Sequence, residues 1–94
     1  MKFSEVTVED VKQSIGYSAD DQNDLIRMHL AAGRAFVRGY TNLPDHLLDE
    51  HEDIAVALLC VAGELFEQRT MTVESDRMNP AVKLILGLYA DNHI

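Results

Sequence analysis

The chain has 94 residues, which is the size of one small domain, so we treat 1–94 as a single unit. Apolar residues make up 47% of the chain, enough for a packed core and too many for a disordered protein. The formal net charge is −8. Such a surface repels nucleic-acid phosphates at long range, which argues against a free-standing DNA-binding protein. The start of the chain, MKFSEVTVED, has no apolar stretch typical of a signal peptide.

The first expected helix is short and covers about Val8 to Ile15. Thr7 can cap it through its hydroxyl, and Asp10 three residues later completes a variant of the capping box. Gly16 follows the last apolar residue, where a glycine commonly ends a helix. A loop then leads to the second helix.

The second expected helix is long, begins after Asp20 or Asp21 as its cap and runs to about Tyr40. Acidic residues in a first turn suit the positive end of the helix dipole. His29 lies on the broad apolar face of this helix. We therefore interpret His29 as a core or boundary residue, not as a metal ligand.

Three arginines lie on the opposite face of this helix, and we call Arg27, Arg34 and Arg38 the arginine stripe. Arginine binds carboxylates and phosphates with two parallel hydrogen bonds, which lysine cannot do. Almost all of the excess negative charge lies after Asn42. The stripe is either a solvated polar face or a surface that meets the acidic half of a second copy. On the second interpretation, Arg34→Glu weakens association and leaves the helical fold intact.

The third expected helix begins at Asp45 and continues through the most apolar stretch of the chain, 54–66. Apolar residues fall on nearly every side of this stretch, which predicts a central helix buried all round. It is shorter than the roughly 20 apolar residues that span a bilayer. The sole cysteine, Cys60, lies within it, and we expect a buried, unreactive thiol.

A polar segment, 70–79, follows Arg69 and is longer than most connections in small domains. Its first part, 70–73, alternates polar and apolar residues and could form a short extended arm that contacts a partner. Asn79 and Pro80 then start the last helix as N-cap and first residue. That helix is apolar over more than half of its circumference, and the last four residues form a short tail. The sequence thus predicts an all-α, four-helix bundle with a short first helix, a long second helix, a buried third helix and a C-terminal helix.

Catalytic and metal-binding motifs are missing from the sequence. His46, Glu50 and His51 do not have the spacing of a zinc-binding HExxH motif. We found no nucleophile motif, phosphate-binding loop or paired cysteines. The sequence therefore predicts a protein that is not an enzyme and that has no cofactor or bound metal.

Three blocks of the chain resemble the small head–tail connector proteins (head-completion adaptors) of long-tailed bacteriophages and prophages. These blocks are 6–41, 55–70 and 79–92. The first resembles a short helix, an acid-rich loop and a long alanine-rich helix ending near an aromatic residue and a threonine. The second is similar to an apolar helix that closes on an aromatic residue and an arginine, here Phe66 and Arg69. The third is similar to a closing helix with a proline, a leucine-rich run and a tyrosine. The chain departs from the family in having Ala90 and Asp91, not a basic residue, after Tyr89, and in a short connection before the third helix.

The resemblance implies a structural role without a catalysed reaction. Connector subunits form a ring, usually matching the twelve-fold portal, and dock beneath the portal protein after DNA packaging. The ring extends the DNA channel and presents a platform for the next head-completion protein or the tail. It implies a location at the virion head–tail junction, and in the bacterial cytoplasm during assembly. DNA would pass through the channel without sequence-specific binding, and no membrane is involved.

We expect contacts with neighbouring subunits or the portal to use the arginine stripe and the region after the third helix. These interface residues are Arg27, Arg34, Arg38, Arg69, Thr70, Met71, Thr72, Val73 and Arg77. The alternative function is a small helical regulator that binds DNA or a regulatory protein, since the first two helices are joined by a short turn and the second of them carries the arginines. A third, an enzyme, depends only on the His46, Glu50 and His51 cluster.

Overall fold

The structure is a computed structural model that describes residues 1–73 and 78–90. Within these ranges the chain forms one short 3-10 helix and five α-helices, and no strand. The elements are η1 (Phe3–Glu5), α1 (Val8–Ile15), α2 (Asn23–Thr41), α3 (Asp45–Leu48), α4 (Glu52–Gln68) and α5 (Pro80–Tyr89). The predicted all-α bundle is confirmed. The expected tail, 91–94, and residues 74–77 of the loop before α5 lie outside the described residues.

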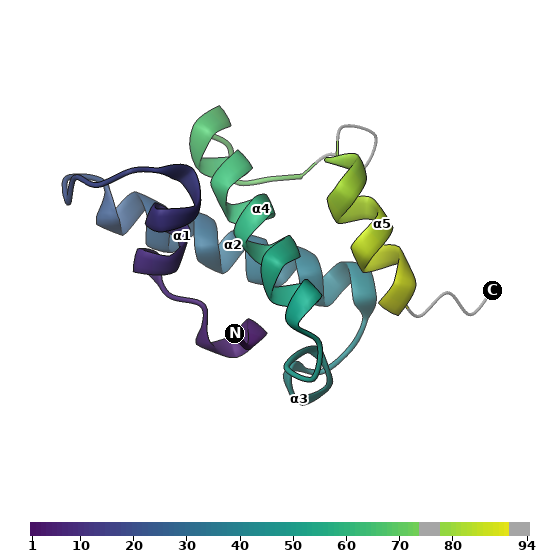
Figure 1. The fold of residues 1–94 in the computed structure, drawn as a ribbon. Coiled ribbons are helices and arrows are strands. Elements are labelled where there is room, and N and C mark those ends of the chain that lie inside the picture. The colour runs from purple at the N-terminus through teal and green to yellow at the C-terminus, as the bar shows by residue number, and fades with distance from the viewer. Residues whose placement is uncertain (74–77, 91–94) are drawn as a thin grey trace.

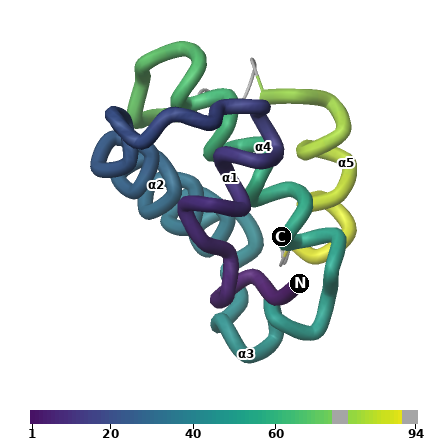
Figure 2. Tube along the Cα trace, turned by 60° about the vertical axis from the view of Figure 1, so that its left-hand side comes forward, coloured from purple at the N-terminus to yellow at the C-terminus, as the bar shows by residue number. Residues whose placement is uncertain are grey.

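The helices form two layers (Figure 1). The long helix α2 makes one layer, and α1, α4 and α5 lie across it with α4 in the middle, as the rotated view also shows (Figure 2). The smallest dimension of the molecule is 18 Å, which fits two layers because packed helices are about 8–10 Å apart. Helix α4 therefore contacts α1, α2 and α5.

Helix α1 begins and ends where its sequence predicts. The backbone N–H of Asp10 donates to the Thr7 hydroxyl at 3.2 Å, and the Thr7 N–H donates to the Asp10 carboxylate at 2.9 Å. Gly16 ends the helix with a φ of 71°, a left-handed conformation that suits glycine. Both ends are thus fixed by residues next to the helix in sequence.

Helix α2 begins later than predicted, at Asn23, and neither acidic residue in the preceding loop caps it. Asp20 instead accepts a hydrogen bond from the Lys12 ammonium at 2.6 Å, and Asp21 accepts one from the Tyr17 hydroxyl. Lys12 is a buried residue although it is charged. The ion pair between Lys12 and Asp20 connects α1 to the loop. The Asp20 carboxylate is therefore not used to cap α2, in contrast to what the sequence predicted.

The predicted third helix is divided into α3 and α4 by a turn after Leu48. The Asp49 carboxylate in this turn accepts hydrogen bonds from the Ser4 N–H at 2.8 Å and the Ser4 hydroxyl at 2.7 Å. Leu48 is fully buried beside it. Contacts with the N-terminal segment therefore fix the turn, and no helix-breaking residue in 45–53 signals it.

Helix α4 is central, but it is not buried all round as predicted. Its buried side includes Ile54, Ala57, Leu58, Val61, Leu65 and Phe66. The opposite side has Val56 at 51% exposure and an exposed Cys60. In this layer α4 lies between α1 and α5 (Figure 1). We call its uncovered side, which includes Val56 and Cys60, the exposed strip of α4. Neither α4 nor any other helix within 1–73 and 78–90 has the length and apolar composition to cross a membrane.

Helix α5 starts as predicted, with Pro80 in its first turn. The Asn79 side chain accepts a hydrogen bond from the Ala81 N–H at 2.8 Å, which satisfies one free donor of the helix start. Val82 and Leu86 are buried against the other helices. Helix α5 thus docks on the bundle through one face only.

Candidate interaction surfaces

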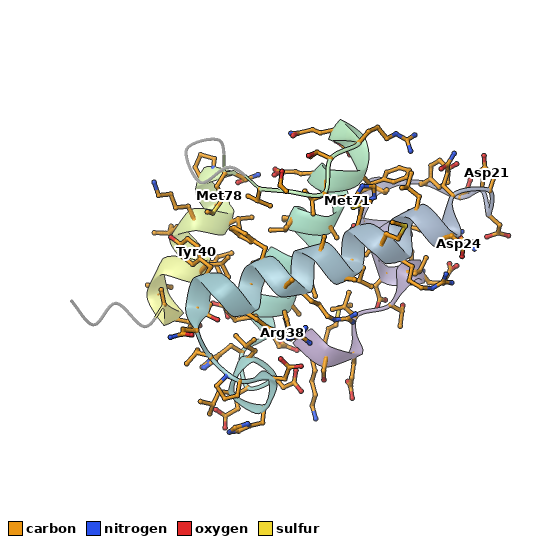
Figure 3. All side chains as sticks on the ribbon, turned by 180° about the vertical axis from the view of Figure 1, so that it is seen from behind. Asp21, Asp24, Arg38, Tyr40, Met71 and Met78 are labelled. Atoms are coloured by element: carbon orange, nitrogen blue, oxygen red, sulfur yellow. The ribbon has the colours of Figure 1, made fainter. Side chains whose placement is uncertain are left out.

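The arginine stripe of α2 does not form one continuous free surface. Arg27 and Arg38 are eleven positions apart in the helix, a rise of about 16 Å. Arg27 is exposed and pairs with Asp24 one turn earlier, near the end of α2 that Asp21 and Asp24 mark (Figure 3). Of the three arginines, Arg27 alone keeps a side chain that is mostly open to solvent and held only by a residue of its own helix.

Arg38 connects α2 to α3 and η1. Its Nε and Nη2 atoms donate to the two carboxylate oxygens of Asp45, each at 2.8 Å. The guanidinium also lies over the Phe3 ring, 5.6 Å from its centre, and the side chain points toward η1 (Figure 3). The hydrogen bonds from Arg38 lower the pKa of the Asp45 carboxyl. Arg38 therefore stabilises the turn after α2.

Arg34 holds the N-terminal segment against α2. Its Nη2 atom donates a hydrogen bond to the Val6 carbonyl oxygen. Its Nε atom is buried and has no acceptor in the described part of the chain. Burial lowers the pKa of the Arg34 guanidinium. Arg34→Glu would therefore remove the hydrogen bond to Val6. That this variant keeps its helical fold and weakens association stays a prediction.

Arg69 follows the last residue of α4, and its side chain stacks on a cluster of aromatic rings. Its backbone is left-handed, with a φ of 55°, and its guanidinium lies 4.5 Å from the centre of the Phe66 ring. Phe66 meets Tyr17 and His29 edge to face, at 5.5 Å and 5.9 Å between ring centres. Arg69 is exposed, so its outer side remains open to a partner.

His29 is a core residue, as its position on the apolar face predicts, with 1% of its surface exposed. Neither ring nitrogen has a hydrogen-bond partner within the described ranges. Burial, and to a lesser degree the charge of Arg69, lower the pKa of the imidazole. Burial therefore favours the neutral form of the His29 imidazole.

The segment after Arg69 has no regular structure in its described part. Thr70, Thr72 and Val73 line a cavity of about 210 Å³ against α4, and Met71 is 40% exposed. The extended arm expected over 70–73 is thus a short irregular segment lying against the bundle (Figure 3). Arg77 lies outside the described residues.

Helix α5 presents a second apolar face, which is not among the predicted interface residues. Leu84 and Leu88 lie one turn apart and are each 70% exposed, on the side opposite to Val82 and Leu86. Lys83 is the sole charged residue of the helix. The sequence of α5 is apolar over more than half of the helix circumference, and this pattern was the signal for such a face. We call the face of α5 that includes Leu84, Leu88 and Lys83 the outer face.

A groove of about 300 Å³ lies over the exposed strip of α4. We call it the α4 groove, and its lining includes Ile15, Val56, Leu59, Cys60, Glu64 and Glu67. Asn79 at the start of α5 closes it on one side and donates a hydrogen bond to Glu64 at 2.9 Å. Cys60 thus lies in a surface groove and not in the core, although partial burial and Glu64 raise the pKa of its thiol.

The residues considered for metal binding do not come together. Within the described residues no group of three or more His, Cys, Asp and Glu side chains could hold a metal ion. His46 is exposed on α3, whereas His51 precedes α4 and stacks on Tyr89 with 4.3 Å between ring centres. The histidines therefore have separate surroundings.

Comparisons of this chain with protein-family models, with curated proteins and with solved structures found no match. The resemblance to connector proteins accordingly stays a hypothesis.

Proposed function

We propose that this protein is a structural subunit of a bacteriophage head–tail connector, which forms a ring under the portal, extends the DNA channel and joins the head to the tail. The observation that carries the proposal is the outer face of α5, where Leu84 and Leu88 remain 70% exposed. Exposed apolar side chains that share one face of a helix are a common feature of protein–protein contact sites. The order of the three blocks that resemble connector proteins adds to this support.

Burial of further apolar surface has a particular value for a chain of this size. A domain of 94 residues buries a smaller fraction of its surface than a large one and is correspondingly marginal in stability. Val56, Leu84 and Leu88 are all more than half exposed. Assembly with other subunits would remove these side chains from water, which favours a role in a multi-subunit structure.

The charges of the chain suit a wall around DNA better than a DNA-reading surface. The net charge is −8, and two of the basic side chains, Lys12 and Arg38, are engaged in internal ion pairs. An acidic wall repels the phosphates weakly, so DNA can slide past it. A regulator that binds DNA would need free lysines and arginines on one face.

The test is to mix the purified protein with an isolated portal ring of the same phage and to measure the mass of the complex by light scattering. We expect a defined number of copies to add to each portal. Arg27→Glu should weaken this addition if the exposed end of α2 meets the portal. Lys2→Glu is the control, because it also reverses an exposed charge but lies outside the arginine stripe. Protein that ignores the portal and binds duplex DNA in a salt-dependent manner would contradict the proposal and favour the regulator.

A further inference from the structure

We infer that the outer face of α5 of one copy docks into the α4 groove of a second copy. The occupant of the groove is thus the same chain, in a head-to-tail contact between two different surfaces. This inference rests on the proposed ring, because it names the contact that would link neighbouring subunits.

The two surfaces match in length and in apolar character. Helix α5 has ten residues, a length of about 15 Å, and the strip from Val56 to Glu67 rises by about 16 Å along α4. Leu84 and Leu88 project one turn apart from the same face of α5. Val56, partly exposed Leu59 and Cys60 provide apolar contacts in the groove. A helix that places leucines at i and i+4 into an apolar groove is a common mode of recognition between proteins.

The charges at the edges of the two surfaces are opposite. Lys83 lies beside the leucines and has no carboxylate within ion-pair distance in the described part of the chain. Glu64 and Glu67 line the α4 groove and form no ion pair with any described residue. A docked α5 would bring its single cation to these two carboxylates. This complementarity selects a second copy over a partner whose helix carries acidic residues.

Within one molecule, the outer face of α5 cannot occupy the α4 groove. The inner face of α5, with Val82 and Leu86, already packs on α2 and α4, and the outer face points away from the groove of its own chain. A contact between different surfaces leaves each new copy with one free face and one free groove. Such contacts continue until a ring closes, or extend as a filament if it does not.

The experiment measures mass against concentration by sedimentation velocity, up to millimolar protein, for the wild type and two variants. Leu88→Asp removes the outer face and Val56→Asp blocks the groove, and we expect each to weaken self-association by at least about tenfold, as loss of a central contact does. Met28→Asp is the matched control, because Met28 is 57% exposed on α2 and outside both surfaces. Far-UV circular dichroism checks that all variants remain helical.

Mixing the two defective variants gives the most specific result. Each retains one intact surface, so an equimolar mixture of Leu88→Asp and Val56→Asp should form a heterodimer of one copy each and nothing larger. A contact between two identical surfaces would not recover in this way. A mixture that stays monomeric would overturn the inference.

Charge exchange tests the orientation of the docked helix. Lys83→Glu and Glu67→Lys should each weaken association, and the double variant should recover it. Wild-type protein that stays monomeric through the whole range, and whose Leu84→Cys variant forms no disulfide ladder through Cys60, would refute the contact. Portal binding separates this outcome from the function: subunits that add to a portal without this contact leave the connector role standing, and self-association without portal binding leaves only the contact.

Discussion

Phe66 near the end of α4 should be among the side chains that contribute most to stability. It is 5% exposed and its ring contacts Tyr17, His29 and Arg69. Replacing a buried phenylalanine by alanine costs about 3–5 kcal/mol, and each edge-to-face aromatic pair contributes about 0.5–1.5 kcal/mol beyond burial. We therefore expect Phe66→Ala to lose about 4–5 kcal/mol. Proteins of this length have a free energy of unfolding of roughly 5–14 kcal/mol, so the variant should be close to unfolding.

Urea denaturation followed by circular dichroism measures this loss. Phe36→Ala is the matched control, because Phe36 is half-buried and, among the described residues, its one aromatic partner is Tyr40, with 5.8 Å between ring centres. We expect this control to lose less than half as much as Phe66→Ala, with the same dependence on urea concentration. Phe66→Leu should fall between the two because it keeps apolar volume and loses the ring contacts. If Phe66→Ala and Phe36→Ala lost equal amounts, the assignment of Phe66 to the core would be refuted.

Three further predictions concern pH, an ion pair and a helix end. The folded state lowers the pKa of His29, so the unfolded state binds the proton more readily. The free energy of unfolding should therefore fall as the pH drops below about 6.5, by at most about 1.4 kcal/mol per pH unit. His29→Leu should remove this pH dependence in urea titrations. Arg38→Lys loses the paired hydrogen bonds to Asp45 and should cost about 0.5–1 kcal/mol, because both side chains are partly exposed and screened; a loss no larger than that of Lys2→Ala would contradict the role given to Arg38. Gly16→Ala should destabilise by about 1–2 kcal/mol because of its left-handed backbone, and Gly16→Asn should cost less in the same thermal melts, since asparagine tolerates this conformation.

The sequence alone determined the features that depend on residues close together in the chain. The Thr7 and Asp10 capping box, the left-handed Gly16 and the Asn79 cap of α5 all lie where the pattern predicts them. Each depends on contacts over three or four residues, which a sequence pattern records directly. The apolar face of α2 likewise predicted that His29 is buried.

Only the tertiary structure decided how the faces of these helices are used. The turn at Asp49 depends on Ser4, which is 45 residues away in sequence, and Arg34 is drawn inward by Val6, which is 28 residues away. Helical periodicity tells which residues share a face, but not which faces find a neighbour in a small bundle. Two layers leave one side of α4 and one side of α5 uncovered. The candidate docking surfaces are therefore products of packing, since the same apolar residues would have formed a core if another helix had covered them.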